Sequence, residues 1–323
     1  MIELSIILVN YNTTDEIIKC IKSIIESDIK FSYEIIVVDN NSKNQAEILN
    51  RLNKHFSEIK IIASQKNLGF TGANNLGIKN ARGQTLLFLN PDIIVQKDAI
   101  MELYKFLSTH RDSGLIGPLT IDESGSVDYY CGRSAPNLLT EFFHHSGLSK
   151  IFFKSKFFGQ YLMTYWDHKT TRKVAAIQGS GMMMRKRDII EIGMLDESFF
   201  LYGEDIDWCY RFLRAGKNNY LCAEAVVIHK RHASVRGNEA LAYIIGCASM
   251  QKFFDKHYGC LTGIIYRLEM FCIYLTKFVI SLCCKPKKSK LFSLHILWAI
   301  GMLKYLRDDK GYPFFKFAFS KFI

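Results

Sequence analysis

The sequence predicts an α/β protein built on a mostly parallel, Rossmann-like central sheet. Continuous apolar runs such as Leu4–Val9 and Leu86–Leu89 are typical of strands that helices cover on both faces. Segments with apolar residues at helical spacing separate these runs. The resulting β-α-β-α-β-α-β order predicts parallel strands joined by right-handed crossovers.

The first strand, 4–9, stops at Asn10-Tyr11-Asn12, and Thr13 or Thr14 is expected to cap the next helix. That helix places isoleucines on one face, at Ile17, Ile18, Ile21, Ile24 and Ile25. The remaining elements of this half are expected as strands at 35–38, 59–63 and 86–89, a helix at 46–55 and a helix through Asn74 and Asn75.

The strand 86–89 ends abruptly at Asn90-Pro91-Asp92. Asp92 therefore follows the carboxyl end of a strand, which is where open α/β sheets bind ligands. A carboxylate beside an Asn can hold a divalent cation through oxygen, and that cation can bind a diphosphate. We expect the substrate at this position.

The second half is less regular. Its elements are expected as helices at 98–108, 187–192 and 204–215, and strands at 115–119, 174–177 and 225–228, the last ending at His229. Glycines in Gly179-Ser180-Gly181 indicate backbone close to a ligand. The aromatic, Lys-containing segment 142–166 faces the acceptor or a membrane, or is an ordinary hydrophobic insertion.

Charge is concentrated at the C-terminus. Residues 251–323 carry 13 Lys and Arg against 4 Asp and Glu, whereas residues 1–250 carry 29 against 27. The near-neutral larger part argues against nucleic-acid binding. Arg267, Glu269 and Lys277 interrupt the apolar segment 261–284, so its uncharged runs fall short of the ~20 residues that span a bilayer. We expect helices lying on an anionic membrane, anchored by the basic cluster 285–290.

The cysteine spacing and the turn after the first strand argue against a disulfide-bonded protein and against a nicotinamide- or flavin-dependent enzyme. None of the nine cysteines forms a Cys-x-x-Cys pair, which indicates a reducing cytosol. The first strand is followed by Asn10-Tyr11-Asn12 and not by Gly-x-Gly-x-x-Gly, which argues against a nicotinamide or flavin cofactor.

Seven motifs occur together in order along residues 3–235. They are Val9-Asn-Tyr-Asn12, Val38-Asp-Asn-Asn-Ser42, Asn67-Leu-Gly-Phe70, Leu89-Asn-Pro-Asp92, Gly179-Ser-Gly181, Tyr202-Gly-Glu-Asp-Ile-Asp207 and His229. The combination resembles family 2 inverting glycosyltransferases of the GT-A fold, in particular the bacterial rhamnosyltransferase-like group. The resemblance implies a catalytic domain at 1–240, with a nucleotide-sugar half at about 1–120 and an acceptor half at about 121–240. A basic, apolar, membrane-associated helical region at 241–323 would follow.

The resemblance also implies a donor site. Its nucleotide-sugar contacts would be Val9, Asn10, Tyr11, Asn12, Asp39, Asn41, Asn67, Gly69, Phe70, Asn74, Asn90, Pro91 and Asp92. Asp39 would accept a hydrogen bond from the pyrimidine N3–H. Asn90-Pro91-Asp92 takes the place of the family's Asp-x-Asp motif, with Asn instead of the first Asp. Asp92 and His229 would bind Mg²⁺ or Mn²⁺, and a buried structural histidine is the alternative for His229.

The family's Glu-Asp motif implies the catalytic pair. Asp205 would be the general base that deprotonates the acceptor hydroxyl, and Glu204 would orient the acceptor or the base. Acceptor contacts would come from Gly179, Ser180, Gly181 and Trp208, although packing in the core is the safer interpretation of Trp208. Asp207 and Arg211, one helical turn apart, are expected to be structural.

The resemblance implies dTDP-L-rhamnose as donor, with UDP-sugars left open. The acceptor would be a polyprenyl-diphosphate-linked glycan of surface polysaccharide synthesis, of the O-antigen or capsule type. The protein would act peripherally at the cytoplasmic face of the membrane. A nucleotidyltransferase is an alternative, although Asn10-Tyr11-Asn12 is no Gly-rich phosphate loop. A non-enzymatic scaffold is a second alternative, although Asp39, Asp92, Glu204 and Asp205 are all present.

Overall fold

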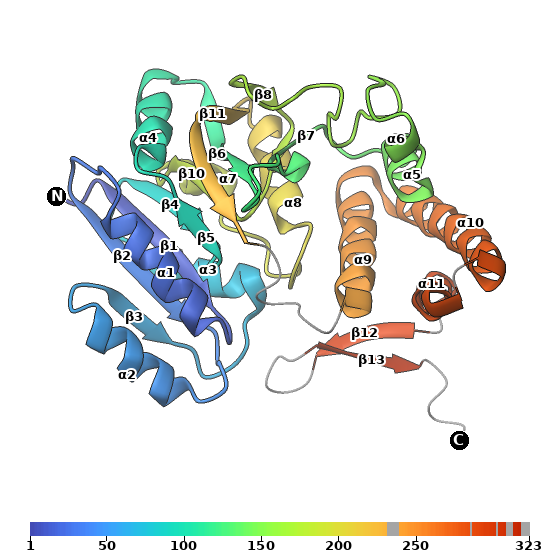
Figure 1. The fold of residues 1–323 in the computed structure, drawn as a ribbon, viewed down its shortest axis with the longest axis horizontal. Coiled ribbons are helices and arrows are strands. Elements are labelled where there is room, and N and C mark those ends of the chain that lie inside the picture. The colour runs from blue at the N-terminus through green and yellow to red at the C-terminus, as the bar shows by residue number, and fades with distance from the viewer. Residues whose placement is uncertain (231–238, 285, 302, 308–312, 318–323) are drawn as a thin grey trace. The chain divides into compact units, whose positions relative to one another are not determined.

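The computed structural model describes residues 1–230, 239–284, 286–301, 303–307 and 313–317. The chain divides into two compact units, whose elements are labelled in Figure 1. Unit 1 comprises residues 1–135, 162–200 and 204–234, and unit 2 comprises residues 136–161, 201–203 and 235–323. This division differs from the expected boundary at residue 240 because residues 136–161 pack with the C-terminal part of the chain.

A mixed sheet forms the centre of unit 1. Its strand order is β3-β2-β1-β4-β10-β6-β11-β5, and β8 pairs with β11 outside this path. The strands are β1 (Leu4–Asn10), β2 (Tyr33–Asp39), β3 (Lys60–Ala63), β4 (Thr85–Leu89), β5 (Ile93–Val95), β6 (Ser113–Ile121), β8 (Arg172–Val174), β10 (Gly181–Arg185) and β11 (Asn218–His229). Pairing is parallel from β3 through β4 and between β6 and β11, which confirms the mostly parallel sheet.

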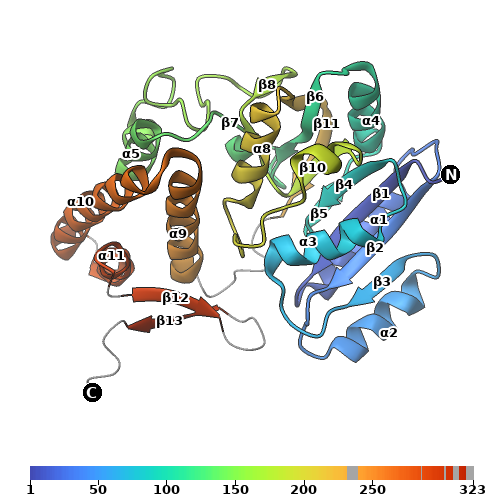
Figure 2. The same ribbon diagram turned by 180° about the vertical axis from the view of Figure 1, so that it is seen from behind.

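The other elements of unit 1 are helices and short pairs. The helices are α1 (Thr14–Ile25), α2 (Gln45–His55), α3 (Gly69–Asn80), α4 (Ala99–Thr109), α7 (Asp188–Ile192), α8 (Glu204–Arg214) and the 3₁₀ turn η1 (Tyr129–Cys131). A separate two-stranded pair joins β7 (Gly132–Arg133) to β9 (Ala176–Ile177). Figure 2 shows α3 and α8 from the opposite side to Figure 1.

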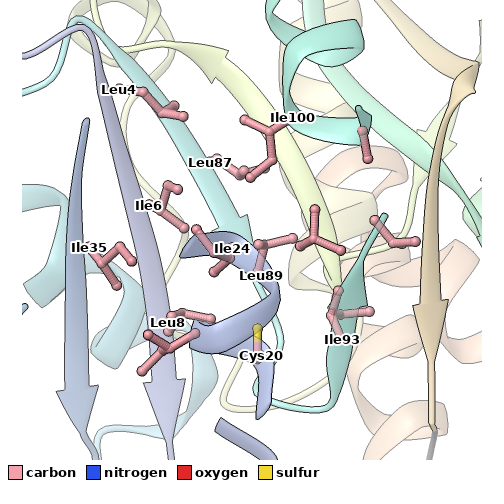
Figure 3. Close-up of a cluster of buried hydrophobic side chains, with 14 of the residues drawn as sticks. Leu4, Ile6, Leu8, Cys20, Ile24, Ile35, Leu87, Leu89, Ile93 and Ile100 are labelled. Atoms are coloured by element: carbon pink, nitrogen blue, oxygen red, sulfur yellow. The ribbon is translucent and has the colours of Figure 1, made fainter. Parts of the chain in front are cut away.

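Alternation along the strands assigns each helix to a face of the sheet. Leu4, Ile6 and Leu8 of β1 lie in one core cluster with residues of α1 and α4, as Figure 3 shows. Residues of the opposite parity face the other side, where Phe88 of β4 packs edge-on against Trp208 of α8. Complete burial of an aliphatic side chain contributes roughly 1.5 to 3 kcal/mol, so these two layers hold the sheet edge in place.

Some local predictions were wrong. Thr13 precedes α1, but its hydroxyl donates to Asn10 Oδ1 at 3.0 Å and makes no capping hydrogen bond. β5 and β10 were not predicted as strands. β10 runs antiparallel to β4, with Gly181 opposite Leu89, so the glycine-containing segment 179–184 is part of the sheet.

Unit 2 is mainly helical. Its elements are α5 (Leu138–Ser146), α6 (Leu148–Ile151), α9 (Glu239–Tyr258), α10 (Cys260–Cys284), α11 (Pro286–Ala299) and the antiparallel hairpin β12 (Leu303–Arg307) and β13 (Pro313–Phe317). The hairpin was not predicted. Within the described ranges, no helix combines the length and apolarity needed to cross a bilayer. The side chains of the predicted basic cluster 285–290 lie outside the described residues.

Candidate functional site

The strand ends β1, β2 and β4 bring polar residues to one edge of the sheet, because parallel strands end on the same side. Asn10 ends β1 and Asp39 ends β2, and Asn10 Nδ2 donates to Asp39 Oδ2 at 2.7 Å. Asp39 Oδ1 accepts from Ser42 N at 3.1 Å and from Gln45 Nε2 at 2.7 Å. Asp39 is fully buried, so it braces the loop after β2. Direct contact with a base therefore requires the loop to uncover it.

The loop before α3 is braced in the same way. Asn40 Nδ2 donates to Asn67 Oδ1 at 2.9 Å, and Asn67 Oδ1 also accepts from Gly69 N at 2.9 Å. Gly69 has a φ of +73°, and a Cβ there would lie 2.4 Å from Phe200 Cδ2. Only glycine fits this turn without displacing Phe200.

The remaining predicted donor contacts differ in accessibility. Asn74 is buried and donates to Phe70 O at 2.8 Å, so it supports the first turn of α3. Asn12 and Asn41 adopt left-handed backbone, with φ of 58° and 62°, a conformation that Asn tolerates. Those with at least part of their surface accessible are Val9, Tyr11, Asn12, Asn41, Phe70 and Asn90.

Asp92 and His229 meet at the end of β4. β5 pairs antiparallel with β11, which places His229 opposite Ile93, and Lys230 N donates to Asp92 O at 3.1 Å. Asp92 Oδ1 lies 3.3 Å from His229 Nε2. On the other side of the ring, His229 Nδ1 lies 4.0 Å from Asp128 Oδ2, beyond hydrogen-bond distance.

Asp92 and His229 offer one carboxylate and one imidazole to a divalent cation. The described part of the chain has no group of three or more His, Cys, Asp and Glu side chains placed to hold a metal. Mg²⁺ and related ions nevertheless bind through one or two protein ligands together with substrate phosphates. A buried carboxylate oxygen next to an imidazole nitrogen fits such a partial ligand set.

Glu204 and Asp205 begin α8, where carboxylates are favourable at the positive end of the helix dipole. Asp205 Oδ2 lies 2.6 Å from Arg133 Nη2, and both side chains are buried. Asp205 Oδ2 also accepts from Gly179 N at 3.2 Å, and Oδ1 accepts from Ile206 N at 2.8 Å. The ion pair with Arg133 and the two backbone hydrogen bonds fix the orientation of the Asp205 carboxylate.

Glu204 has the opposite electrostatic environment. Its burial, and secondly the charge of Asp205, raise the pKa of the Glu204 carboxyl to about 8. Glu204 is therefore protonated near neutral pH, whereas Asp205 has a cationic partner. Within the described ranges, Glu204 Oε2 and Ser180 Oγ are among the buried side-chain atoms that have no hydrogen-bond partner in the protein.

Hydrogen bonds through residues 179 and 180 link the loop that carries Asp92 to Asp205. Asn90 N donates to Ser180 O at 3.0 Å, and the neighbouring Gly179 N donates to Asp205. A Cβ on Gly179 would lie 3.5 Å from Asp205 Cβ, and a Cβ on Gly181 would lie 2.9 Å from Pro118 Cγ. The predicted close approach at these glycines is therefore, in this structure, an approach to the protein's own chain.

A match to a protein-family model identifies the family of this chain. The family model described as Glycosyl transferase family 2 matches residues 5–193. This chain belongs to glycosyl transferase family 2. The protein is therefore an enzyme that transfers a sugar, and the alternatives of a nucleotidyltransferase and of a non-enzymatic scaffold are set aside.

Curated relatives agree. The glycosyltransferase is 30% identical over 233 residues to the low-salt glycan biosynthesis hexosyltransferase Agl10 of Haloferax volcanii, covering 71% of this chain and 67% of that protein. It is 27% identical over 236 residues to rhamnosyltransferase WbbL of Escherichia coli, covering 70% and 83%. It is 25% identical over 217 residues to an N-acetylglucosaminyl-diphospho-decaprenol L-rhamnosyltransferase of Mycobacterium tuberculosis, covering 62% and 68%.

A solved structure confirms the fold. The glycosyltransferase superposes on GalNAc-T7, crystallised with UDP, GalNAc and Mn²⁺, with a TM-score of 0.58 and 15% identity. The match covers 93% of this chain and 56% of that one. The fold is thus the expected GT-A fold, with a mixed, mostly parallel sheet.

Trp208 of the glycosyltransferase packs in the core, which is the alternative that the sequence left open for it. Its ring is fully buried between Phe88 and Phe212, and Nε1 donates to Gly193 O at 3.0 Å. The neighbouring Asp207 accepts from Arg211 Nε at 2.9 Å, as expected for a structural pair one turn apart.

The sequence analysis of the glycosyltransferase missed Arg133 and Asp128. Both belong to the short segment after β6 that no motif marks, and they reach the site only because η1 and β7 fold back onto it. Arg133 lies next to the Glu-Asp motif only in the folded chain, and no spacing in the sequence indicates that contact.

A separate pocket of about 650 Å³ lies at the opposite end of β4, around Thr85 and Arg185. Arg185 donates there to the main-chain oxygens of Ser113 and His110, at 2.9 and 3.0 Å. This guanidinium supports the sheet, and the pocket is remote from the carboxylates of the glycosyltransferase site.

Proposed function

We propose that the protein transfers L-rhamnose from dTDP-L-rhamnose to a hydroxyl of a lipid-linked glycan, with inversion at the anomeric carbon. The observation that carries this proposal is the single sheet edge on which the Asp92–His229 pair adjoins the Glu204–Asp205 pair. The rhamnose donor and the lipid-linked acceptor are supported by the names of two relatives, a rhamnosyltransferase and a diphospho-decaprenol L-rhamnosyltransferase.

The donor nucleotide would lie over the loops that follow β1, β2 and β3. Tyr11, Asn12, Asn41 and Phe70 present accessible surface there. Asp39 would read the N3–H of the pyrimidine once its loop opens. Because thymine and uracil share this group, a UDP-sugar is the second candidate donor.

Asp92 and His229 would hold Mg²⁺ or Mn²⁺ against the donor diphosphate. When bound, the cation would neutralise the charge that develops on the leaving nucleoside diphosphate. The half-accessible Asn90 would border the diphosphate, and Pro91 would fix the turn that carries Asp92.

The acceptor hydroxyl would lose its proton to Asp205, which Arg133 orients through an ion pair of 2.6 Å. Glu204, neutral near pH 7, would donate a hydrogen bond to the acceptor. Ser180 Oγ and the backbone at Gly179 and Gly181 would line the acceptor side. Attack by this oxygen opposite the leaving diphosphate gives the inverted product.

A donor screen tests the proposal. Purified protein is incubated with dTDP-L-rhamnose, UDP-glucose or UDP-N-acetylglucosamine and a short-chain N-acetylglucosaminyl-diphospholipid, with Mn²⁺, with Mg²⁺ or with EDTA. We expect transfer from dTDP-L-rhamnose that EDTA abolishes and either cation restores. Transfer from a UDP-sugar alone would replace the donor assignment, and full activity in EDTA would remove the metal role of Asp92 and His229.

With a lipid-linked acceptor, the reaction would take place at the cytoplasmic face of the membrane, where the protein would bind peripherally. The expected basic character of residues 251–323 supports attraction to anionic lipids.

A further inference from the structure

A compact turn in unit 2 exposes aromatic and basic side chains together. It comprises residues 150–157, from the end of α6 onward (Figure 1). Its exposed apolar side chains are Ile151 at 73%, Phe152 at 47%, Phe153 at 41% and Phe157 at 56%. Its exposed cationic side chains are Lys150, Lys154 and Lys156. We call this segment the Phe-Lys turn.

The Phe-Lys turn is a built structure. Phe158 stacks on Phe152 with ring centroids 4.7 Å apart, and it packs 4.8 Å from Phe143, which is buried in α5. Ser155 Oγ accepts from the backbone of Phe157 and Phe158 at 3.2 and 3.3 Å. The exposed rings are thus fixed by packing on buried aromatic residues. Their exposure to water is unfavourable compared with burial.

Charge identifies the partner of the Phe-Lys turn. The segment 142–166 contains no Asp or Glu, so nothing within it neutralises the three lysines. Apolar rings interleaved with lysines match the boundary between acyl chains and anionic headgroups, where rings enter the bilayer and ammonium groups reach phosphates. A second copy of the chain is a poorer partner, because two such turns would bring like charges together.

A second apolar surface lies on the same unit. Exposed apolar residues recur along α10, most of them three, four or seven positions apart, at Leu261, Ile264, Ile265, Leu268, Leu275, Val279 and Leu282. α5, which carries the base of the Phe-Lys turn, is joined to α10 by the hydrogen bond between His145 Nδ1 and Tyr274 OH at 3.0 Å. Unit 2 therefore has two lipid-compatible surfaces on packed helices.

We infer that the Phe-Lys turn inserts Phe152, Phe153 and Phe157 into the headgroup boundary of an anionic bilayer. The inference deepens the proposed function, since it names how the enzyme reaches a lipid-linked acceptor. The sequence expectation assigned the membrane anchor to residues 251–323 and left open whether the segment 142–166 faces the acceptor, faces a membrane or is an ordinary hydrophobic insertion.

Vesicle flotation of the full chain tests the inference. The vesicles are phosphatidylcholine alone, or phosphatidylcholine with about 30% phosphatidylglycerol to supply negative charge. We expect wild type to bind the anionic vesicles, and Phe152→Ser/Phe153→Ser/Phe157→Ser to lower the partition coefficient at least ~10-fold. Each Lys→Ser change at 150, 154 or 156 should lower it roughly 5-fold. The matched control, Ile25→Ser/Ile190→Ser, removes exposed apolar residues of unit 1 and should bind as wild type.

Phe153→Trp provides a readout that does not depend on loss of binding. Its emission should shift to shorter wavelength on anionic vesicles, and lipids brominated on the acyl chain should quench it. Unchanged flotation of the triple Phe variant, or absence of the shift, overturns the inference. A dimer in sedimentation velocity that the triple variant abolishes would assign the surface to a second copy and overturn it as well.

Turnover separates this inference from the proposed function. On a soluble short-chain acceptor the triple Phe variant should keep wild-type turnover. If wild type floats as expected but shows no transfer, the proposed function fails while the membrane surface stands.

Discussion

The two units treat apolar side chains in opposite ways. Unit 1 buries them in two layers against the sheet, and among the described residues its exposed large apolar side chains are Met1, Ile25 and Ile190. Unit 2 exposes them along α10 and in the Phe-Lys turn. Unit 1 also buries ionisable side chains next to one another, at Arg133, Glu204 and Asp205. Unit 1 therefore holds ionisable side chains in fixed positions, whereas unit 2 presents an exposed apolar surface.

That separation predicts where substitutions act. Changes at buried charges of unit 1 should reduce stability and chemistry strongly, because each partner depends on the other. Changes on the exposed apolar surface of unit 2 should leave both almost untouched and act on membrane binding.

The largest effect is expected for Arg133→Met. It leaves Asp205 buried without its cation, which costs about 3 to 5 kcal/mol of unfolding free energy. Arg133→Lys should recover part of the loss. Urea denaturation measures both. Arg51→Met is the matched control, because its pair with Asp15 is solvent-exposed and should contribute at most ~1 kcal/mol. Equal midpoints for the Arg133→Met and Arg51→Met variants would refute the bracing role.

Asp205→Asn should retain donor binding and transfer at least ~100-fold more slowly, which is the scale of losing a general base. Nucleoside diphosphate release measures turnover, and titration of nucleotide measures binding. Asp15→Asn, at an exposed site on α1, should behave as wild type. Turnover of Asp205→Asn within a few-fold of wild type would transfer the base role to another group.

Glu204→Gln should change the pH dependence of stability. The pKa of Glu204 is about 8 in the folded protein against 4.5 as the ordinary value, so folding keeps a proton that the unfolded chain loses. Stability from this group is present below about pH 4.5 and falls as pH rises towards 8. The Gln variant lacks this slope, so between about pH 5 and pH 7 its free energy of unfolding should rise relative to that of wild type by roughly 2 to 3 kcal/mol. Parallel urea midpoints across that range would contradict the raised pKa.

The smallest effect is expected for Leu268→Ala on α10. Leu268 is 60% exposed, so the free energy of unfolding should change by less than ~0.5 kcal/mol. Leu103→Ala on α4 is the matched core change, since Leu103 is 1% exposed and its truncation should cost about 2 to 5 kcal/mol. Similar losses at the two positions would mean that the exposed face of α10 is covered in solution.

Sequence patterns predicted the parallel half of the sheet well, because strands such as Leu4–Val9 end in polar residues that need no distant partner to be recognised. Sequence patterns did not predict the strands that pair with partners far away in the sequence. The Met-rich strand β10 and the three-residue β5 acquire their identity from β4 and β11, which lie far away in sequence.

The candidate functional site was likewise predictable only where its residues stand in sequence motifs. Asp92, Glu204 and Asp205 stand in motifs, so they could be proposed directly. Arg133 and Asp128 act through distances of 2.6 and 4.0 Å to residues about seventy and one hundred positions later, which no spacing rule encodes. The role of Trp208 stayed open in the sequence because an aromatic residue beside the Glu-Asp motif looks the same whether it faces inward or outward.

The place of β10 in the sheet has a consequence for synthesis on the ribosome. β10 separates β4 from β6, so a nascent chain that has emerged only through residue 121 leaves both strands with an open edge. At ~5 to 20 residues per second, the missing strand follows several seconds later. During that interval the half-built sheet exposes unpaired backbone to other chains, and we expect a trigger-factor-like chaperone to raise the yield of soluble protein more than a faster translation rate does.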